Sequence, residues 1–207
     1  MKHSPPWSFK GIALMASPTA WLKIAVATIA GTLVASASMA QSVDDVAAWS
    51  ALRSGGVALF RHANAPGFSD PQGFKLDDCS TQRNLDALGQ AQSRQLGERF
   101  RTQRVTVGGV MASQWCRARD TASLAFSAHV QTEPAFNSFF ENRANEPAQT
   151  AAAKAILMKW KGPGALVVVT HQVNITALTG IVPSSGEGVV LQSAGNSLKV
   201  VGRIPPP

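Results

Sequence analysis

Short apolar runs alternate with longer amphipathic segments along residues 43–204, and this alternation predicts an α/β domain. Buried strands are expected at 57–62, 109–113 and 165–170, an edge strand at 135–140 and a closing hairpin at 189–204. Helices are expected at 43–53, 84–101, 114–122, 147–160 and 173–180. Strands that alternate with helices are typical of a mostly parallel sheet covered on both faces.

The two N-terminal helices of this pattern each show an apolar face. In helix 43–53 that face is Val46, Trp49 and Leu52. In helix 84–101 it comprises Leu85, Leu88, Gly89, Leu96 and Phe100. Asn84 is expected to cap this second helix, because an Asn side chain accepts hydrogen bonds from free N–H groups at a helix start.

A long loop is expected between the first strand and the second helix, at 64–81. It contains Pro66, Gly67, Pro71 and Gly73, which interrupt regular structure. Connections of this length are usually functional. Because the loop starts directly after His62, we expect it to wall a cleft at the strand end.

The charge balance of the 207-residue chain argues against nucleic-acid binding. The formal net charge is +7, but residues 1–40 carry Lys2, Lys10 and Lys23 and no acidic residue, so the remainder is only mildly basic. No block of Lys and Arg occurs. A modest positive field favours a small anionic substrate.

The first 40 residues have the pattern of an export signal. Lys23 precedes an apolar stretch at 24–35, and Ser38-Met39-Ala40 is a small-x-small cleavage site. We therefore expect a signal peptide at 1–40, a single mature domain at 41–207 without a stable membrane anchor, and a periplasmic or secreted protein. An uncleaved anchor is the alternative, and Met15 is an alternative start.

Export changes the interpretation of the two cysteines, Cys79 and Cys116. In an oxidising compartment an even pair favours a disulfide, and closing a loop of this length would stabilise the fold by roughly 3–4 kcal/mol. Two unpaired thiols are the alternative. Without a nearby pair of histidines the cysteines do not form a zinc site.

Residues suited to phosphate chemistry occur where strands end. Arg61 and His62 close the first strand, and His171 directly follows the strand 165–170. Parallel strands present their carboxyl ends at one edge of a sheet, so both histidines should face one cleft.

Arg117 lies near a strand-to-helix junction and should point inward. Arg119, two residues further on, should then lie at the surface with Asp120. Arg83 either contacts an anion at the helix start or is solvated.

Four short motifs occur one after another along the chain. They are Leu59-Phe60-Arg61-His62-Ala63; Thr81 through Asn84-Leu85 and Gly89; Ser113-x-x-x-Arg117-Ala118-x-x-Thr121-Ala122; and Val168-Val169-Thr170-His171. Together they resemble the histidine phosphatase superfamily over residues 57–180. Ala63 and Gln172 depart from the resemblance, since glycine is usual at both positions.

The resemblance implies a phosphoglycerate-mutase-like fold, a three-layer α/β/α sandwich with a mostly parallel central sheet. It implies that His62 is the nucleophile that becomes phosphohistidine and that Arg61, Arg117 and His171 form the phosphate pocket. Cationic side chains suit phosphoryl transfer, whose transition state places charge on the equatorial oxygens. Neither a metal nor another cofactor is expected.

The leaving group also needs a proton donor, and Glu141 is our first candidate. The resemblance places the acid at the end of a segment such as 136–140, and Phe139 and Phe140 could desolvate its carboxyl group. A salt bridge to Arg143 is the alternative role. Other candidates remain: Glu133, Glu146, Asp70, Asp77 and Asp78.

The sequence thus predicts an exported, metal-independent phosphatase that acts on a small phosphorylated substrate. A phosphorylated envelope component is one class of such substrates. A phosphomutase and a catalytically weak protein that binds a phosphorylated ligand are the alternatives. The substrate itself is not encoded in any motif, because loop conformation decides specificity.

Overall fold

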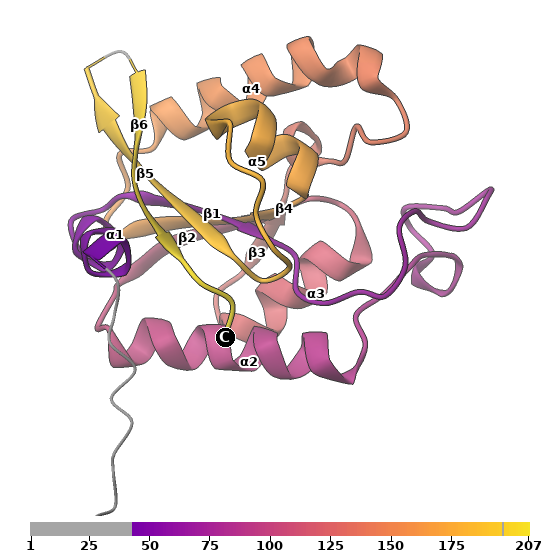
Figure 1. The fold of residues 1–207 in the computed structure, drawn as a ribbon, viewed down its shortest axis with the longest axis horizontal. Helices are drawn as coiled ribbons and strands as arrows, with labels where there is room; N and C mark the ends of the chain where they lie inside the picture. The colour runs from indigo at the N-terminus through magenta and orange to yellow at the C-terminus, as the bar shows by residue number, and fades with distance from the viewer. Residues whose placement is uncertain (1–42, 196) are drawn as a thin grey trace, which may run out of the picture. The chain divides into compact units, whose positions relative to one another are not determined.

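The computed structural model describes residues 43–195 and 197–207. The expected signal segment at 1–40 lies outside this range. The described residues form a six-stranded sheet in the order β3-β2-β4-β1-β5-β6 (Figure 1). The strands, in chain order, are β1 Val57–Arg61, β2 Val107–Ala112, β3 Val130–Thr132, β4 Ala165–Thr170, β5 Gly188–Ala194 and β6 Ser197–Ile204. β3, β2, β4 and β1 are parallel, and β5 and β6 join as an antiparallel hairpin.

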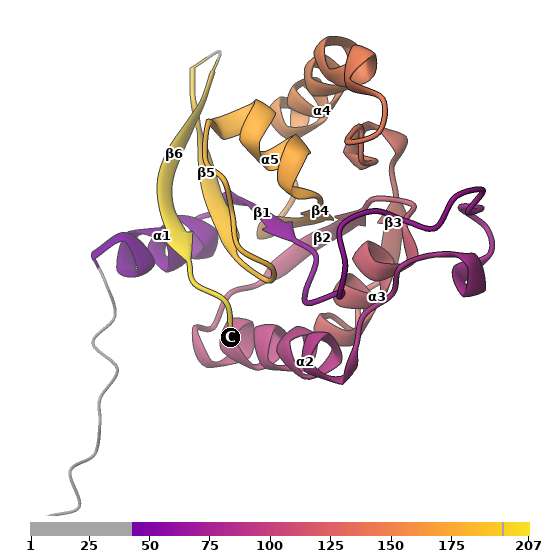
Figure 2. The same cartoon turned by 45° about the vertical axis from the view of Figure 1, so that its right-hand side comes forward.

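Helices cover both faces of this sheet, as Figure 2 shows. They are α1 Val43–Arg53, α2 Ala87–Thr102, α3 Cys116–Ala125, α4 Glu146–Lys159 and α5 Gln172–Thr179. α2 and α3 pack together on one face, while α4 and α5 lie on the other. The α/β/α architecture predicted from the sequence is therefore present. Within the described residues no helix is long and apolar enough to cross a membrane.

Two separate apolar cores sandwich the sheet because strand side chains alternate in direction. Ala58 and Phe60 of β1 belong to the core shared with α1, α2 and α3. Their neighbours Val57 and Leu59 belong to the core beneath α4 and α5. Every residue of β4 is buried, as expected for a central parallel strand.

Some local predictions are wrong. Helix α2 begins at Ala87, and its cap is Asp86, whose carboxylate accepts from the Gly89 N–H at 2.8 Å. The Asn84 side chain instead donates to carbonyl oxygens of the preceding turn. Leu88 and, in α1, Val46 are exposed, because sequence periodicity overestimates the width of the buried stripe.

The expected edge strand at 135–140 is also absent. The short strand β3 forms the edge of the sheet next to β2, and Pro134–Phe136 forms a 3-10 helix. Proline lacks the N–H that a ladder requires, so it ends the strand at this point. Ala135 and Phe136 are still buried, against the core beneath α4, which explains the apolar pattern of the segment.

Candidate active site

The strand register brings the two predicted histidines together. β1 and β4 are adjacent parallel strands in which Arg61 pairs with Thr170, so His62 and His171 leave the sheet side by side. Their ring centroids lie 5.5 Å apart. Both side chains are buried, at 2% and 4% exposure, and both line a cavity of about 560 Å³ at the carboxyl ends of the strands.

His62 is held in one tautomer. Its Nδ1 lies 2.8 Å from the carbonyl oxygen of Ala63. Because a carbonyl only accepts hydrogen bonds, Nδ1 must carry the proton, and Nε2 keeps a lone pair. Burial, followed by the charge of Arg117, lowers the pKa of His62 from 6.5 to about 3. The imidazole is therefore neutral and nucleophilic near pH 7.

A hydrogen-bond chain holds the second histidine. His171 Nε2 lies 2.8 Å from Ser113 Oγ, and the Ser113 hydroxyl donates to Asn137 Oδ1 at 3.2 Å. That donation leaves Ser113 to accept from an Nε2–H of His171. Burial, followed by the proximity of His62, lowers the pKa of His171 well below its usual value. In this state His171 is neutral, so the protonated form that would donate to a phosphate is disfavoured until an anion binds.

Four arginines line the cavity, and three of them, Arg61, Arg83 and Arg117, are anchored by the protein close to the histidines. Arg61 Nη1 donates to the Pro183 carbonyl at 3.0 Å, and Arg83 Nη1 donates to the Ala65 carbonyl. Arg117 is 3% exposed, and Asp70 pairs with it. Burial and then the charge of Arg117 lower the pKa of Arg61, and they lower that of Arg83 to about 10, so both guanidinium groups stay protonated at neutral pH.

The structure separates the acidic candidates. Glu141 lines the cavity but is exposed, and the partly exposed Phe140 beside it does not enclose its carboxylate. Arg143 pairs with Glu146 at 3.7 Å, so the alternative role for Glu141 as its partner is not observed. Glu133 caps the 3-10 helix at Ala135 and does not line the cavity.

The loop aspartates differ in the same way. Asp70 lines the cavity, whereas Asp77 and Asp78 are exposed and do not. Asp78 instead caps the short helix at Ser80. Among residues 43–195 and 197–207, no cluster of three or more His, Cys, Asp and Glu side chains is arranged to hold a metal ion.

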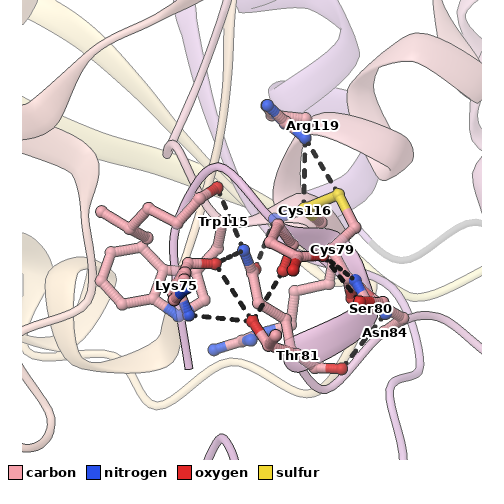
Figure 3. The surroundings of a disulfide bond; sticks show 12 residues. Lys75, Cys79, Ser80, Thr81, Asn84, Trp115, Cys116 and Arg119 are labelled. Carbon is pink, nitrogen blue, oxygen red and sulfur yellow. Dashed lines mark hydrogen bonds between the residues drawn. A yellow bond between two sulfur atoms is a disulfide. The ribbon is translucent and has the colours of Figure 1, made fainter. Parts of the chain in front are cut away.

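Cys79 and Cys116 form a disulfide that ties the long loop to the start of α3, immediately before Arg117 (Figure 3). Arg119 Nη2 donates to both sulfur atoms at 3.1 Å, so this residue packs on the disulfide instead of being fully solvated as predicted. The buried Gln82 adds a second link, because its Oε1 accepts from the Cys116 N–H while its Nε2 donates to the Lys75 carbonyl.

Several residues of the site had no assigned role at the sequence level. Ser113 belongs to the motif Ser113-x-x-x-Arg117, so its place near the site could have been predicted. No motif includes Asn137, and none assigns a role to Trp115. The Trp115 ring lies 5.4 Å from that of His171, and its indole N–H donates to Asp70. These contacts link the loop to the second histidine.

Several solved structures that resemble this chain are phosphatases. The protein histidine phosphatase SixA, solved with tungstate, is 14% identical and aligns with a TM-score of 0.55, covering 73% of this chain and 97% of that one. A putative phosphohistidine phosphatase SixA from Agrobacterium tumefaciens is 15% identical with a TM-score of 0.52, over 74% and 99% of the two chains.

A third similar structure is a phosphoserine phosphatase from Entamoeba histolytica, at 12% identity and a TM-score of 0.51, with coverage of 72% and 95%. No protein-family profile matches the sequence. No curated protein matches it either. The structural likeness shows that the chain shares the phosphoglycerate-mutase-like fold of these phosphatases, which is the fold that the resemblance implied.

Proposed function

We propose that the protein is an exported, metal-independent phosphatase that hydrolyses phosphomonoesters through a phosphohistidine at His62. The observation that carries this proposal is the tautomer of His62, whose Nδ1 bonds the Ala63 carbonyl and whose Nε2 accepts no hydrogen bond from the described residues. The cationic cavity around it and the fold shared with phosphatases support the same activity.

In the first step, His62 Nε2 attacks phosphorus and the bond from phosphorus to the leaving oxygen breaks. Arg61, Arg83 and Arg117 stabilise the charge on the phosphoryl oxygens. A bound dianion also favours protonation of His171, which then donates to the phosphoryl group. Glu141, at the cavity wall, supplies a proton to the leaving alcohol.

In the second step, water attacks phosphorus and the N–P bond breaks. Glu141, now ionised, takes the proton of this water. Inorganic phosphate leaves, and His62 returns to its neutral Nδ1–H tautomer. Since the guanidinium groups supply the positive charge, no step requires a metal ion.

The dimensions of the cavity favour a substrate larger than phosphate itself. A volume of about 560 Å³ is in the usual range for small-molecule sites. Phe68, which is 94% exposed, and Phe140 contribute apolar surface to its lining. We infer that a small phosphorylated molecule binds here, and a phosphorylated envelope component belongs to that class.

The test is hydrolysis of 4-nitrophenyl phosphate in the presence of EDTA, with the His62→Ala variant beside the wild type. Turnover that resists EDTA and is lost in the variant supports the proposal. Acid-labile, base-stable 32P incorporation from a labelled substrate identifies the phosphohistidine. Turnover that EDTA abolishes, or that survives in His62→Ala, contradicts it. Fractionation of cells that express the full chain tests export.

A further inference from the structure

Asp70 occupies an unusual position for a loop carboxylate. It belongs to the loop 64–81, yet its side chain is only 5% exposed and it lines the same cavity as the two histidines. Its two oxygens accept from both terminal nitrogens of Arg117, at 2.8 and 3.1 Å. The Arg83 backbone N–H and the Trp115 indole N–H donate to it as well, at 2.9 and 2.8 Å.

This set of donors makes Asp70 an anchor. A bidentate pair fixes both the position and the plane of a guanidinium group, which a single contact does not. Asp70 lies in the loop and Arg117 in α3, so the carboxylate also joins these two walls of the cavity. If the Asp70 carboxylate were displaced each time a substrate bound, all four of these hydrogen bonds would have to break.

The hydrogen bonds also determine the charge of Asp70. Burial by itself raises the pKa of this carboxyl, but the hydrogen bonds from Arg117 and the Arg83 backbone outweigh that effect and lower it. Asp70 is therefore ionised and is excluded as the proton donor. Four arginines and two carboxylates, Asp70 and Glu141, line the cavity, so it stays cationic although Asp70 is ionised. A positive cavity favours a phosphomonoester dianion.

We propose that Asp70 is a positioning residue for phosphate binding: its carboxylate holds the Arg117 guanidinium in the place and plane from which it binds the phosphoryl group. This inference rests on the proposed function, but its test measures binding and does not depend on turnover. The opposite hypothesis is that Asp70 competes with phosphate for Arg117. It predicts that removing the carboxylate strengthens phosphate binding, whereas a positioning role predicts weaker binding.

The experiment is a double-mutant cycle in the full chain, with binding of inorganic phosphate measured by calorimetry at pH 7.5. The variants are Asp70→Asn, Arg117→Lys and the double substitution. Asp77→Asn is the matched control, because Asp77 is an exposed carboxylate of the same loop. Asp70→Asn should weaken phosphate binding at least fivefold, although it removes a negative charge. In the Arg117→Lys background it should weaken binding less than twofold further, because Asp70 acts through Arg117.

Each other outcome overturns the proposal. Tighter phosphate binding by Asp70→Asn shows that the carboxylate competes with the ligand, and additive effects show that it does not act through Arg117. If Asp70→Asn does not fold, Asp70→Glu replaces it. This variant keeps the charge but moves the carboxylate by one methylene group, so unchanged binding contradicts a positioning role.

The same proteins separate this inference from the proposed function. A wild type that binds phosphate and shows the expected coupling but hydrolyses no ester contradicts only the phosphatase. A wild type that hydrolyses esters but shows additive effects contradicts only the role of Asp70.

Discussion

Arg61 and Thr170 are register partners on adjacent parallel strands, and this pairing places the next residue of each strand, His62 and His171, in one cavity. A slip of one residue would turn one of the two side chains to the opposite face of the sheet. The register is therefore what converts two separate strand-end histidines into a pair.

Acid should destabilise the protein through this histidine pair. The pKa of His62 is about 3 in the folded state against 6.5 ordinarily, so the unfolded chain binds more protons between these values. The contribution of neutral His62 to the free energy of unfolding is complete above pH 6.5. It is lost as the pH falls toward 3, by up to about 1.4 kcal/mol per pH unit. Urea unfolding at pH 4 to 7 measures the slope, which His62→Asn should reduce. His129→Asn is the control at an exposed histidine, and an equal effect of both variants would contradict the prediction.

Gly89→Ala should impair both stability and catalysis. A methyl group at this position would lie 2.1 Å from the carbonyl oxygen of Asn64, two residues after His62. We expect a loss of about 1–3 kcal/mol in the free energy of unfolding and a lower kcat, because the backbone that follows His62 must shift. Gly97→Ala is the matched control on the same helix, where the methyl group would meet the Ala125 carbonyl, also at 2.1 Å. It should lower the free energy of unfolding and leave kcat unchanged.

Ser113→Ala should disturb His171. The substitution removes the hydroxyl that bonds Nε2, and a buried donor without a partner costs about 1–3 kcal/mol. We expect kcat to fall about tenfold and the 15N chemical shifts of the His171 ring to change. Ser123→Ala, at an exposed position of α3, should change neither quantity. Unchanged ring shifts in Ser113→Ala would show that the hydroxyl does not set the tautomer.

Reduction of the disulfide should loosen the wall of the site. A bridge across 37 residues stabilises the folded state by roughly 3–4 kcal/mol in the chain-entropy model, through its effect on the unfolded chain. Guanidinium unfolding with and without dithiothreitol measures this difference, and kcat should fall too, because Cys116 precedes Arg117. The Cys79→Ser/Cys116→Ser protein should behave like the reduced protein and show no further response to dithiothreitol.

Glu141→Gln should reveal its role through the leaving group. If Glu141 donates a proton, kcat should fall more than tenfold for an alkyl phosphate but only slightly for 4-nitrophenyl phosphate, whose leaving group needs little protonation. Glu146→Gln is the control, since Glu146 is a nearby exposed carboxylate that does not itself line the cavity. An equal loss for both substrates would assign Glu141 a different role and reopen the search for the donor.

Much of the architecture followed from local sequence. Apolar runs such as 165–170 predict buried strands because burial on both faces requires unbroken hydrophobic residues, and the first residue after such a strand faces the cleft. His62, His171 and Arg117 could therefore be placed at one site in advance. The start of the second helix was predicted less exactly: Asn84 was expected to cap it, but the backbone path begins the helix at Ala87 and makes Asp86 the cap.

By itself the sequence determined which strands carry the histidines and which arginines lie near them, because these relationships depend on neighbours along the chain. Only the tertiary structure decided that Asp70 meets Arg117, 47 residues away, and that Ser113 and Asn137 hold His171. The reason is physical: the loop 64–81 has no periodic pattern, and its path depends on partners such as Gln82 and the disulfide, which come together only when the chain folds.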